Sequence, residues 1–415
     1  MNGETSVPSR SAITLDVING DLEIGEHTIV RGTGNPPAVR VNGTVYCEGH
    51  NTFECSLFAR ELNAEDSVTI RGDLEVEEDI EVEDGRLEVY GRMKAEDVDV
   101  DDAVYVSKDL VANDVDVGGC LRVDGNTTAE SIDVGGTFDA KGEVKAEEID
   151  VGGRLTIESK VDIESIDVGG TATVAGGRIR EIDVGGTFES KSPLEFEDID
   201  VGGTIILAGK SKGGKIEVGG FLKTDGDLEF EQIDAGGKVE VKGQASGEDM
   251  EVGGRVDIDG SLSLTGTMEV GGRADVSGEI ASKNLEIGGS LRAKKVTTQE
   301  RVEVGGSINT GEGVTARSVE IGNRATAHGP IRAEEIDIGR GAEVEDLYGK
   351  HIVLRSGASA GNVYGKSLFI ESNCYINGEV QYTNDLRQGD HVSYAQTPKK
   401  VNSLPPRVSV TSILL

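Results

Sequence analysis

Aromatic side chains are scarce in this chain, and tryptophan is missing altogether. Phe, Tyr and Trp together make up 4% of the 415 residues. A carbohydrate-binding or adhesive β protein would usually carry more aromatic side chains along its binding groove. A narrow core of stacked Val, Ile and Leu has little room for rings, so the scarcity favours an elongated repeat architecture over a thick globular core.

Positive charge is also in short supply. The chain has 41 Lys and Arg against 76 Asp and Glu, which gives a formal net charge of −35. Such an acidic surface repels phosphate backbones and anionic lipid headgroups. We therefore exclude nucleic acid as a partner, and the charge argues against direct membrane binding.

Long apolar runs are a third absence. No stretch approaches the roughly 20 consecutive apolar residues of a membrane span. Residues 1–10 are polar and lack the apolar segment of a signal peptide. We therefore expect a cytoplasmic protein that meets membranes only through partners.

The four cysteines are too few for a disulfide framework. Cys47 and Cys55 stand at inward positions beside Val45 and Phe53, which predicts small buried hydrophobic side chains. Together with His50 they resemble part of a zinc site, but no fourth ligand lies at zinc-site spacing. We therefore predict no metal and no cofactor.

What the chain does have is a five-residue motif that recurs between Val115 and Gly339. It reads Val-Asp-Val-Gly-Gly at 115–119 and Ile-Asp-Val-Gly-Gly at 132–136 and 149–153. Steps between copies are 17 residues, with one of 16 and one of 18. A short, regular period of this kind indicates a solenoid. The third residue of the motif falls at 117, 134, 151, 168, 184, 201, 218, 235, 252, 270, 287, 304, 321 and 338.

Within one repeat the apolar residues come in pairs two apart, which is the spacing of one face of a strand. Ile149/Val151, Leu155/Ile157 and Val161/Ile163 form three such pairs. No i, i+3, i+4 stripe of a helix persists for two turns. The pattern predicts an all-β fold, a triangular parallel β-helix of roughly 22 coils of about 17 residues, with the right-handed winding usual for parallel crossovers. We expect the Gly-Gly pair at one corner, where positive φ would favour glycine.

Both ends of the repeat region have a different composition. Residues 1–12 and 386–415 are rich in Ser, Pro, Asn and Gly and carry no sustained pairs, which predicts disordered tails around one β-helix at 13–385. The segment 32–37 predicts a loop.

The two ends of such a solenoid expose unpaired N–H and C=O groups, which template further strand pairing unless they are covered. The sequence shows no amphipathic helix that would cap either end. We therefore predict polymerisation through the terminal coils; the alternative is that a tail folds over and caps its own end. The predicted interface residues are Leu15, Val17, Leu22 and Ile24 at one end and Leu368, Ile370, Ile376, Val380 and Tyr382 at the other.

The middle residue of each motif is acidic and should point outward. Three interpretations are open: a solvated face, adaptation to a salty cytoplasm, or a site that gathers divalent cations or a basic partner. The second predicts a melting temperature that rises from low salt to molar NaCl, because salt shortens the range of the repulsion; a flat melting temperature would contradict it. This acidic column comprises Asp99, Asp116, Asp133, Asp150, Asp167, Asp183, Asp200, Glu217, Asp234, Glu251, Glu269, Glu286, Glu303, Glu320 and Asp337.

The chain resembles the bactofilins, the polymer-forming cytoskeletal proteins. The shared features are a strand-only repeat of about 17 residues, paired Val/Ile positions, recurrent glycine corners and proline-containing tails, over residues 13–385. The resemblance implies a right-handed triangular β-helix, nucleotide-independent assembly end to end into non-polar filaments, and a role in cell shape or in positioning other cytoskeletal proteins. The core is longer than is usual in that family, and the acidity suggests an expanded member from a salt-loving archaeon.

Two other classes are weighed against it. Left-handed β-helix acyltransferases repeat Ile-Gly-containing hexapeptides, and residues 22–27 are locally similar. Their coil is 18 residues and they need a catalytic His, whereas the five His here share no common setting, so we predict no enzyme and no catalytic residue. The second alternative is a monomeric or dimeric scaffold whose long faces dock other proteins.

Overall fold

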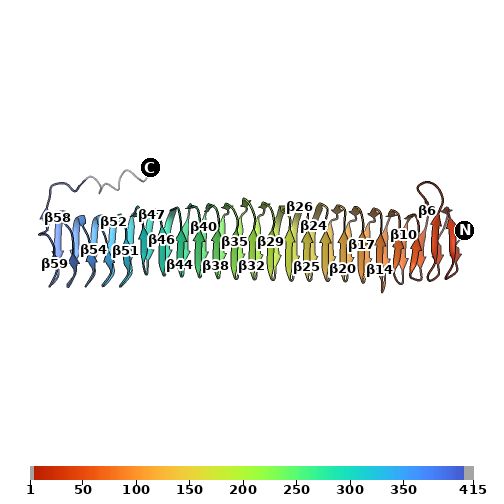
Figure 1. The fold of residues 1–415 in the computed structure, drawn as a ribbon, viewed down its shortest axis with the longest axis horizontal. Helices are drawn as coiled ribbons and strands as arrows, with labels where there is room; N and C mark the ends of the chain where they lie inside the picture. Colours follow the sequence, from red (N-terminus) through yellow and green to blue (C-terminus); the bar gives the residue numbers. More distant parts are fainter. Residues whose placement is uncertain (1–3, 406–415) are drawn as a thin grey trace. The chain divides into compact units, whose positions relative to one another are not determined.

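Strands are the only regular elements between Glu4 and Pro405, the residues that the computed structural model describes. The chain has 60 strands there and no helix, which confirms the predicted all-β class. It divides into two compact units, Met1–Leu207 and Ala208–Leu415, a division that falls inside the predicted repeat region. In each unit the strands stand side by side in chain order (Figure 1).

Each turn of unit 1 contributes three strand segments. A representative turn comprises β22 (Ser131–Val134), β23 (Thr137–Ala140) and the first half of β24 (Val144–Val151). Each segment pairs in parallel with its counterpart one turn away, as Ile132 does with Ile149. Unit 2 repeats the arrangement, for example in β40 (Asp249–Val252), β41 (Arg255–Ile258) and β42 (Leu262–Leu264). The predicted three-sided parallel β-solenoid with a 17-residue period is thereby confirmed.

We name the three sides by their outward residues. The acidic face contains β22 and its counterparts, the second face contains β23 and its counterparts, and the third face contains the segment that begins at Val144. Inward residues fill the core: Ile149, Leu155 and Val161 are 0%, 0% and 4% exposed. Because successive strand residues alternate between inside and outside, the paired apolar pattern suffices to build this core.

The glycine corners are present, but their physical reason differs from the prediction. The Gly-Gly pairs of the repeated motif are absent from the positive-φ glycines, which instead include Gly49 and, outside the motif, Gly176 and Gly177. A Cβ atom on Gly152 would lie 2.4 Å from the carbonyl oxygen of Gly135 one turn earlier, and one on Gly153 would lie 2.5 Å from that of Gly136. Glycine is therefore required because consecutive turns approach closely at this corner.

Strand pairing extends beyond the predicted boundaries at both ends. β1 (Thr5–Val7) lies within the segment expected to be a tail, and its Val7 is buried above Ile24. β59 (Ser393–Tyr394) and β60 (Lys399–Lys400) lie beyond residue 385. None of these three strands contains two aliphatic residues spaced two apart, which hid them from a search for apolar pairs. The outermost parts of both predicted tails, 1–3 and 406–415, lie outside the described residues.

Local features bear out two smaller predictions. An antiparallel bridge between Thr33 and Ala38 closes the predicted loop. Cys47 and Cys55 are buried, and desolvation raises the pKa of their thiols to about 12 and about 11.

Among residues 4–405 there is no helix of the length and apolarity needed to cross a bilayer.

Candidate assembly surfaces at the terminal turns

The first turn of unit 1 has neighbours on one side only. β1 pairs with β4 (Leu22–Ile24), β2 (Ala12–Leu15) pairs with β5 (Ile29–Gly32), and β3 (Val17–Ile18) pairs with β6 (Ala38–Val41). Within residues 4–405 no strand lies against the other edge of β1, β2 or β3. This turn therefore presents a strand edge that can accept another chain.

Three inward side chains of that turn, those of Ile13, Leu15 and Ile18, are apolar and incompletely covered, whereas Val7 is buried. Ile13 lies in register with the buried Val30, and Ile18 with the buried Val41. Both side chains are half-buried, as is Leu15, whereas their counterparts in the middle of the unit are close to 0% exposed. Val17 points outward and is 52% exposed. The end of unit 1 is thus an apolar surface bordered by unpaired backbone.

Two of the four interface residues predicted at this end do not belong to the first turn. Leu15 and Val17 belong to the first turn, as predicted. Leu22 and Ile24 lie one turn further in, covered by Thr5 and Val7, and are 0% and 1% exposed. The prediction missed β1 because Pro8, Ser9 and Arg10 separate it from the next apolar pair. The short Thr5-Ser6-Val7 alternation was the signal that could have found it.

The last turn of unit 2 lies further along the chain than predicted. Leu368 and Ile370, in β56 (Val363–Ile370), are covered by Leu386 and Gln388 of β58 (Val380–Gln388). Ile376 is covered by Tyr394 of β59. All three covered side chains are at most 2% exposed.

The two remaining predicted residues lie in β58 and are also covered. Val380 is 1% exposed, and Tyr382 is half-buried with Lys400 of β60 in register beside it. The five predicted residues are therefore one turn inside the end. The residues at inward positions of the final turn include Leu386, Gln388, Tyr394 and Lys400.

This final turn is more polar than the first turn of unit 1. Gln388 and Lys400 occupy columns that are inward in earlier turns, yet both are exposed. The Tyr394 hydroxyl donates a hydrogen bond to Gln388 Oε1 at 2.8 Å, and desolvation raises the pKa of Tyr394. Polar end turns are typical of solenoid caps. The two ends therefore differ in chemistry.

The acidic column is present on the acidic face of each unit. In unit 1 Asp116 lies in register between Asp99 and Asp133, and the same pairing continues to Asp200. None of the seven Asp of this stretch has an ion-pair partner within the described residues. In unit 2 the column has partial compensation, for example between Arg301 and Glu320 at 2.8 Å.

Repulsion and desolvation both act on the unit 1 column. The pKa values of Asp116, Asp150 and Asp183 are raised, first by partial burial and then by the neighbouring carboxylates. Two charges one strand spacing apart repel by about 0.9 kcal/mol in water before ionic screening. No group of three His, Cys, Asp or Glu side chains that could hold a metal ion occurs in residues 4–405.

Removing one charge from the column should stabilise the fold at low salt. Asp150→Asn relieves two neighbouring repulsions, so we expect about 1 kcal/mol of added stability at pH 7. A carboxyl group whose pKa is raised by folding destabilises the folded state at pH values above its folded-state pKa. This destabilisation disappears as the pH falls toward the unfolded-state pKa, which is near 4. The gain should therefore vanish near pH 4, and shrink in 1 M NaCl.

Thermal denaturation of the two proteins at pH 7 and pH 4, at low and high salt, measures this gain. Asp139→Asn on the second face is the matched control, because Asp139 is outward between Arg122 and Thr156 rather than between carboxylates. A stabilisation by Asp150→Asn that is independent of salt would contradict the electrostatic account.

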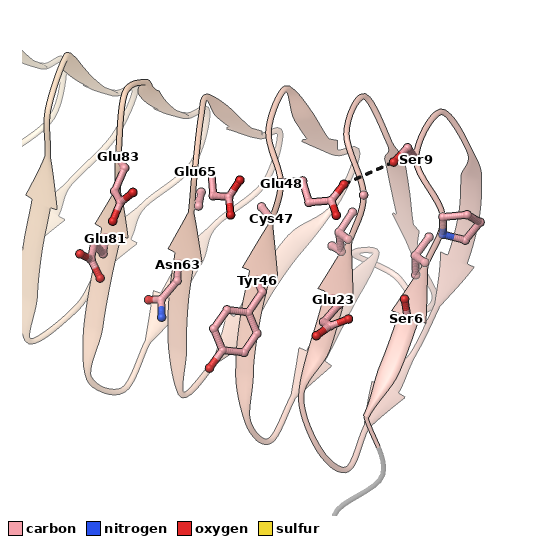
Figure 2. Close-up of a pocket in the computed structure, with 15 residues that line it drawn as sticks. Ser6, Ser9, Glu23, Tyr46, Cys47, Glu48, Asn63, Glu65, Glu81 and Glu83 are labelled. Atoms are coloured by element: carbon pink, nitrogen blue, oxygen red, sulfur yellow. Dashed lines mark hydrogen bonds between the residues drawn. The ribbon is translucent and has the colours of Figure 1, made fainter.

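A groove of about 490 Å³ lies on the acidic face of the first turns of unit 1. Figure 2 shows glutamates from successive turns along it, with the exposed Tyr46 among them. No Lys or Arg is among its lining residues. Ser9 Oγ donates to Glu48 Oε2 at 3.4 Å. The lining glutamates are Glu23, Glu48, Glu65, Glu81 and Glu83.

No protein-family model, curated protein or solved structure matches this chain. A functional assignment therefore depends on the geometry.

Two of the five His, His27 and His50, stack with their ring centroids 4.9 Å apart, and His50 Nε2 lies 3.5 Å from Asp66 Oδ2. Their spacing in the sequence, 23 positions apart, does not predict that these two rings meet. The strands of the first turn each have a neighbouring strand on one edge only, and this open edge is the feature with the clearest capacity to bind a partner.

Proposed function

We propose that this chain is a bactofilin-like structural protein that assembles end to end with copies of itself and needs no nucleotide to do so. The observation that carries the proposal is the first turn, where β1, β2 and β3 each lack a neighbour and Ile13, Leu15 and Ile18 are left half-buried. Strand pairing and apolar burial in a second copy would complete this turn.

Assembly would be driven by the same two contributions that stabilise the fold, burial of apolar side chains and backbone hydrogen bonds between strands. Completing the burial of three half-buried aliphatic side chains contributes about 1 kcal/mol each. Backbone hydrogen bonds along three strands add to this and fix the register. Because every turn has the same three-sided outline, an added turn finds a matching set of strands.

A cytoskeletal or positioning role in the cytoplasm follows from this proposal. A stack of turns with polar outer faces suits a scaffold on which cell-shape proteins gather. The proposal assigns the chain no catalytic residue, metal or cofactor.

Sedimentation velocity of the full chain over a hundredfold concentration range, without nucleotide, tests the proposal. We expect species larger than the monomer whose fraction grows with concentration. A single monomeric species at every concentration would contradict it.

A second candidate is a scaffold that does not polymerise and docks other proteins along its faces. The polar final turn favours it, since Gln388 and Lys400 stand where a stacking surface would carry apolar side chains. The same sedimentation experiment separates the two, because this candidate predicts no assembly beyond a dimer.

A further inference from the structure

The third face of unit 1 carries a cavity of about 390 Å³ near its start. This third-face cavity spans three consecutive turns, those of β6, β9 (Ser56–Ala59) and β12 (Leu74–Val76). Arg40, Phe58 and Glu75 are outward residues of these strands and lie in register with one another. The lining also includes Asn42, Arg60 and Glu77.

Charge is divided along the cavity. Arg40 and Arg60 come from the two turns nearer the start of the chain, and Glu75 and Glu77 come from the turn that follows. Arg60 is held within the protein, since its Nη1 donates to Glu78 Oε2 at 2.9 Å. The Arg40 guanidinium and the Glu77 carboxylate have no ion-pair or hydrogen-bond partner within residues 4–405. Among these residues the cavity therefore has an unpaired cation at one end and an unpaired anion at the other.

The ring of Phe58 separates the two charged ends. Arg40 Cζ lies 4.1 Å from the centroid of this ring, so the guanidinium stacks on the ring and is held in one orientation. The N–H donors of a stacked guanidinium point outward in its plane, where they are available to a carboxylate. Phe58 is half-buried, and its exposed part offers an apolar contact in the middle of the cavity.

The backbone of the third face restricts how a peptide can bind here. β9 pairs with β6 on one edge and with β12 on the other, so a peptide cannot join this face as a further strand. It must bind through its side chains. A polyproline II segment meets this condition, because it has no internal hydrogen bonds and keeps its backbone in water. Grooves that contain aromatic rings are common binding sites for such segments.

The distance between the charges also agrees with polyproline II. Arg40 and Glu75 are two strand spacings apart, which is about 9.6 Å. Polyproline II has three residues per turn and a rise of about 3.1 Å per residue, so residues i and i+3 lie on the same side about 9.3 Å apart. In a β-strand, residues i and i+3 would point to opposite sides.

We propose that the third-face cavity binds a polyproline II segment of a partner protein with the pattern acidic-Pro-Pro-basic. The carboxylate of the segment binds Arg40, its proline rings pack on Phe58, and its cation binds Glu75 and Glu77. This site lies on the side of the solenoid and uses none of the open strand edges of the first turn. It goes beyond the proposed assembly, because one copy of the chain contains the whole site.

Fluorescence anisotropy of labelled peptides with the full chain tests the site. The probe is the peptide Glu-Pro-Pro-Lys, acetylated and amidated at its ends, and Lys-Pro-Pro-Lys is compared with it. We expect Glu-Pro-Pro-Lys to bind at least tenfold more tightly, although the net charge of −35 favours the more basic peptide. Equal or tighter binding of Lys-Pro-Pro-Lys, or no saturable binding of Glu-Pro-Pro-Lys, would overturn the proposal.

A charge-reversal variant tests the role of Arg40. Its side chain is exposed, so Arg40→Glu should leave the fold intact and reverse the preference in favour of Lys-Pro-Pro-Lys. The matched control is Lys145→Glu, at an outward position of the same face between Thr128 and Asp162. This control should keep the original preference. Equal effects of the two variants would overturn the assignment of the acidic residue to Arg40.

Peptide binding and assembly have separate readouts, since sedimentation velocity measures assembly in the same samples. Phe58→Ala should weaken binding of Glu-Pro-Pro-Lys at least tenfold, and a thermal melt checks that the variant is folded. Normal assembly without peptide binding by the unaltered chain would overturn this inference alone. A monomer that binds the peptide with the expected preference would support this inference and contradict the proposed assembly.

Discussion

Alanine in place of Gly152 is expected to destabilise the turns around it by about 2–3 kcal/mol. The added Cβ would lie 2.4 Å from the carbonyl oxygen of Gly135. That oxygen belongs to backbone held by strand pairing on both sides, so it cannot move without separating two turns. Hydrogen exchange of the amides of residues 149–157 measures the loss locally, which suits a solenoid whose stability is a sum of neighbouring contacts.

Gly311→Ala is the matched control for this prediction. A Cβ there would meet nothing closer than the Lys294 carbonyl oxygen at 3.8 Å, so we expect less than about 0.5 kcal/mol of change. Equal destabilisation by the two substitutions would mean that close approach of consecutive turns is not what requires glycine at the corner.

Arginine in place of Leu15 is expected to abolish assembly while leaving the fold intact. Leu15 is half-buried in the first turn and has a neighbouring strand on one side only, so a longer charged side chain can turn toward solvent. In a stacked copy the same charge would be buried without a partner, at a cost of several kcal/mol. Sedimentation velocity should show a monomer at concentrations where the unaltered chain assembles, a shift of at least about a hundredfold in the association constant.

Thr14→Arg places the same charge on the adjacent residue, which points outward and is exposed. We expect it to assemble like the unaltered chain and to melt at the same temperature as Leu15→Arg. Normal assembly of Leu15→Arg would exclude the first turn as the contact, and failure of both variants would indicate a long-range charge effect instead.

The period and the strand pairs were sufficient to predict the solenoid. Ile149, Val151 and Leu155 repeat their inward positions turn after turn, so one correctly interpreted repeat specifies its neighbours. The cause of the Gly-Gly corner could not be predicted in the same way. Sequence alone associates glycine with positive φ, whereas the 2.4 Å approach to a neighbouring carbonyl depends on how closely two turns stack.

The ends were the least predictable part because each terminal turn departs from the repeat. Val7 is a core residue preceding a Pro-Ser-Arg interruption, and Gln388 and Lys400 are polar residues at inward positions. A pattern of apolar pairs stops one turn early at both ends. The groove of glutamates at the first turns also escaped prediction, since the acidic face as a whole hides a local cluster.

Electron microscopy of the purified full chain, at low and molar salt and without nucleotide, tests the central claim of end-to-end assembly most directly. The account predicts filaments one solenoid wide that grow longer with protein concentration and are absent from Leu15→Arg. Uniform single particles at all concentrations, with the unaltered chain indistinguishable from Leu15→Arg, would contradict it.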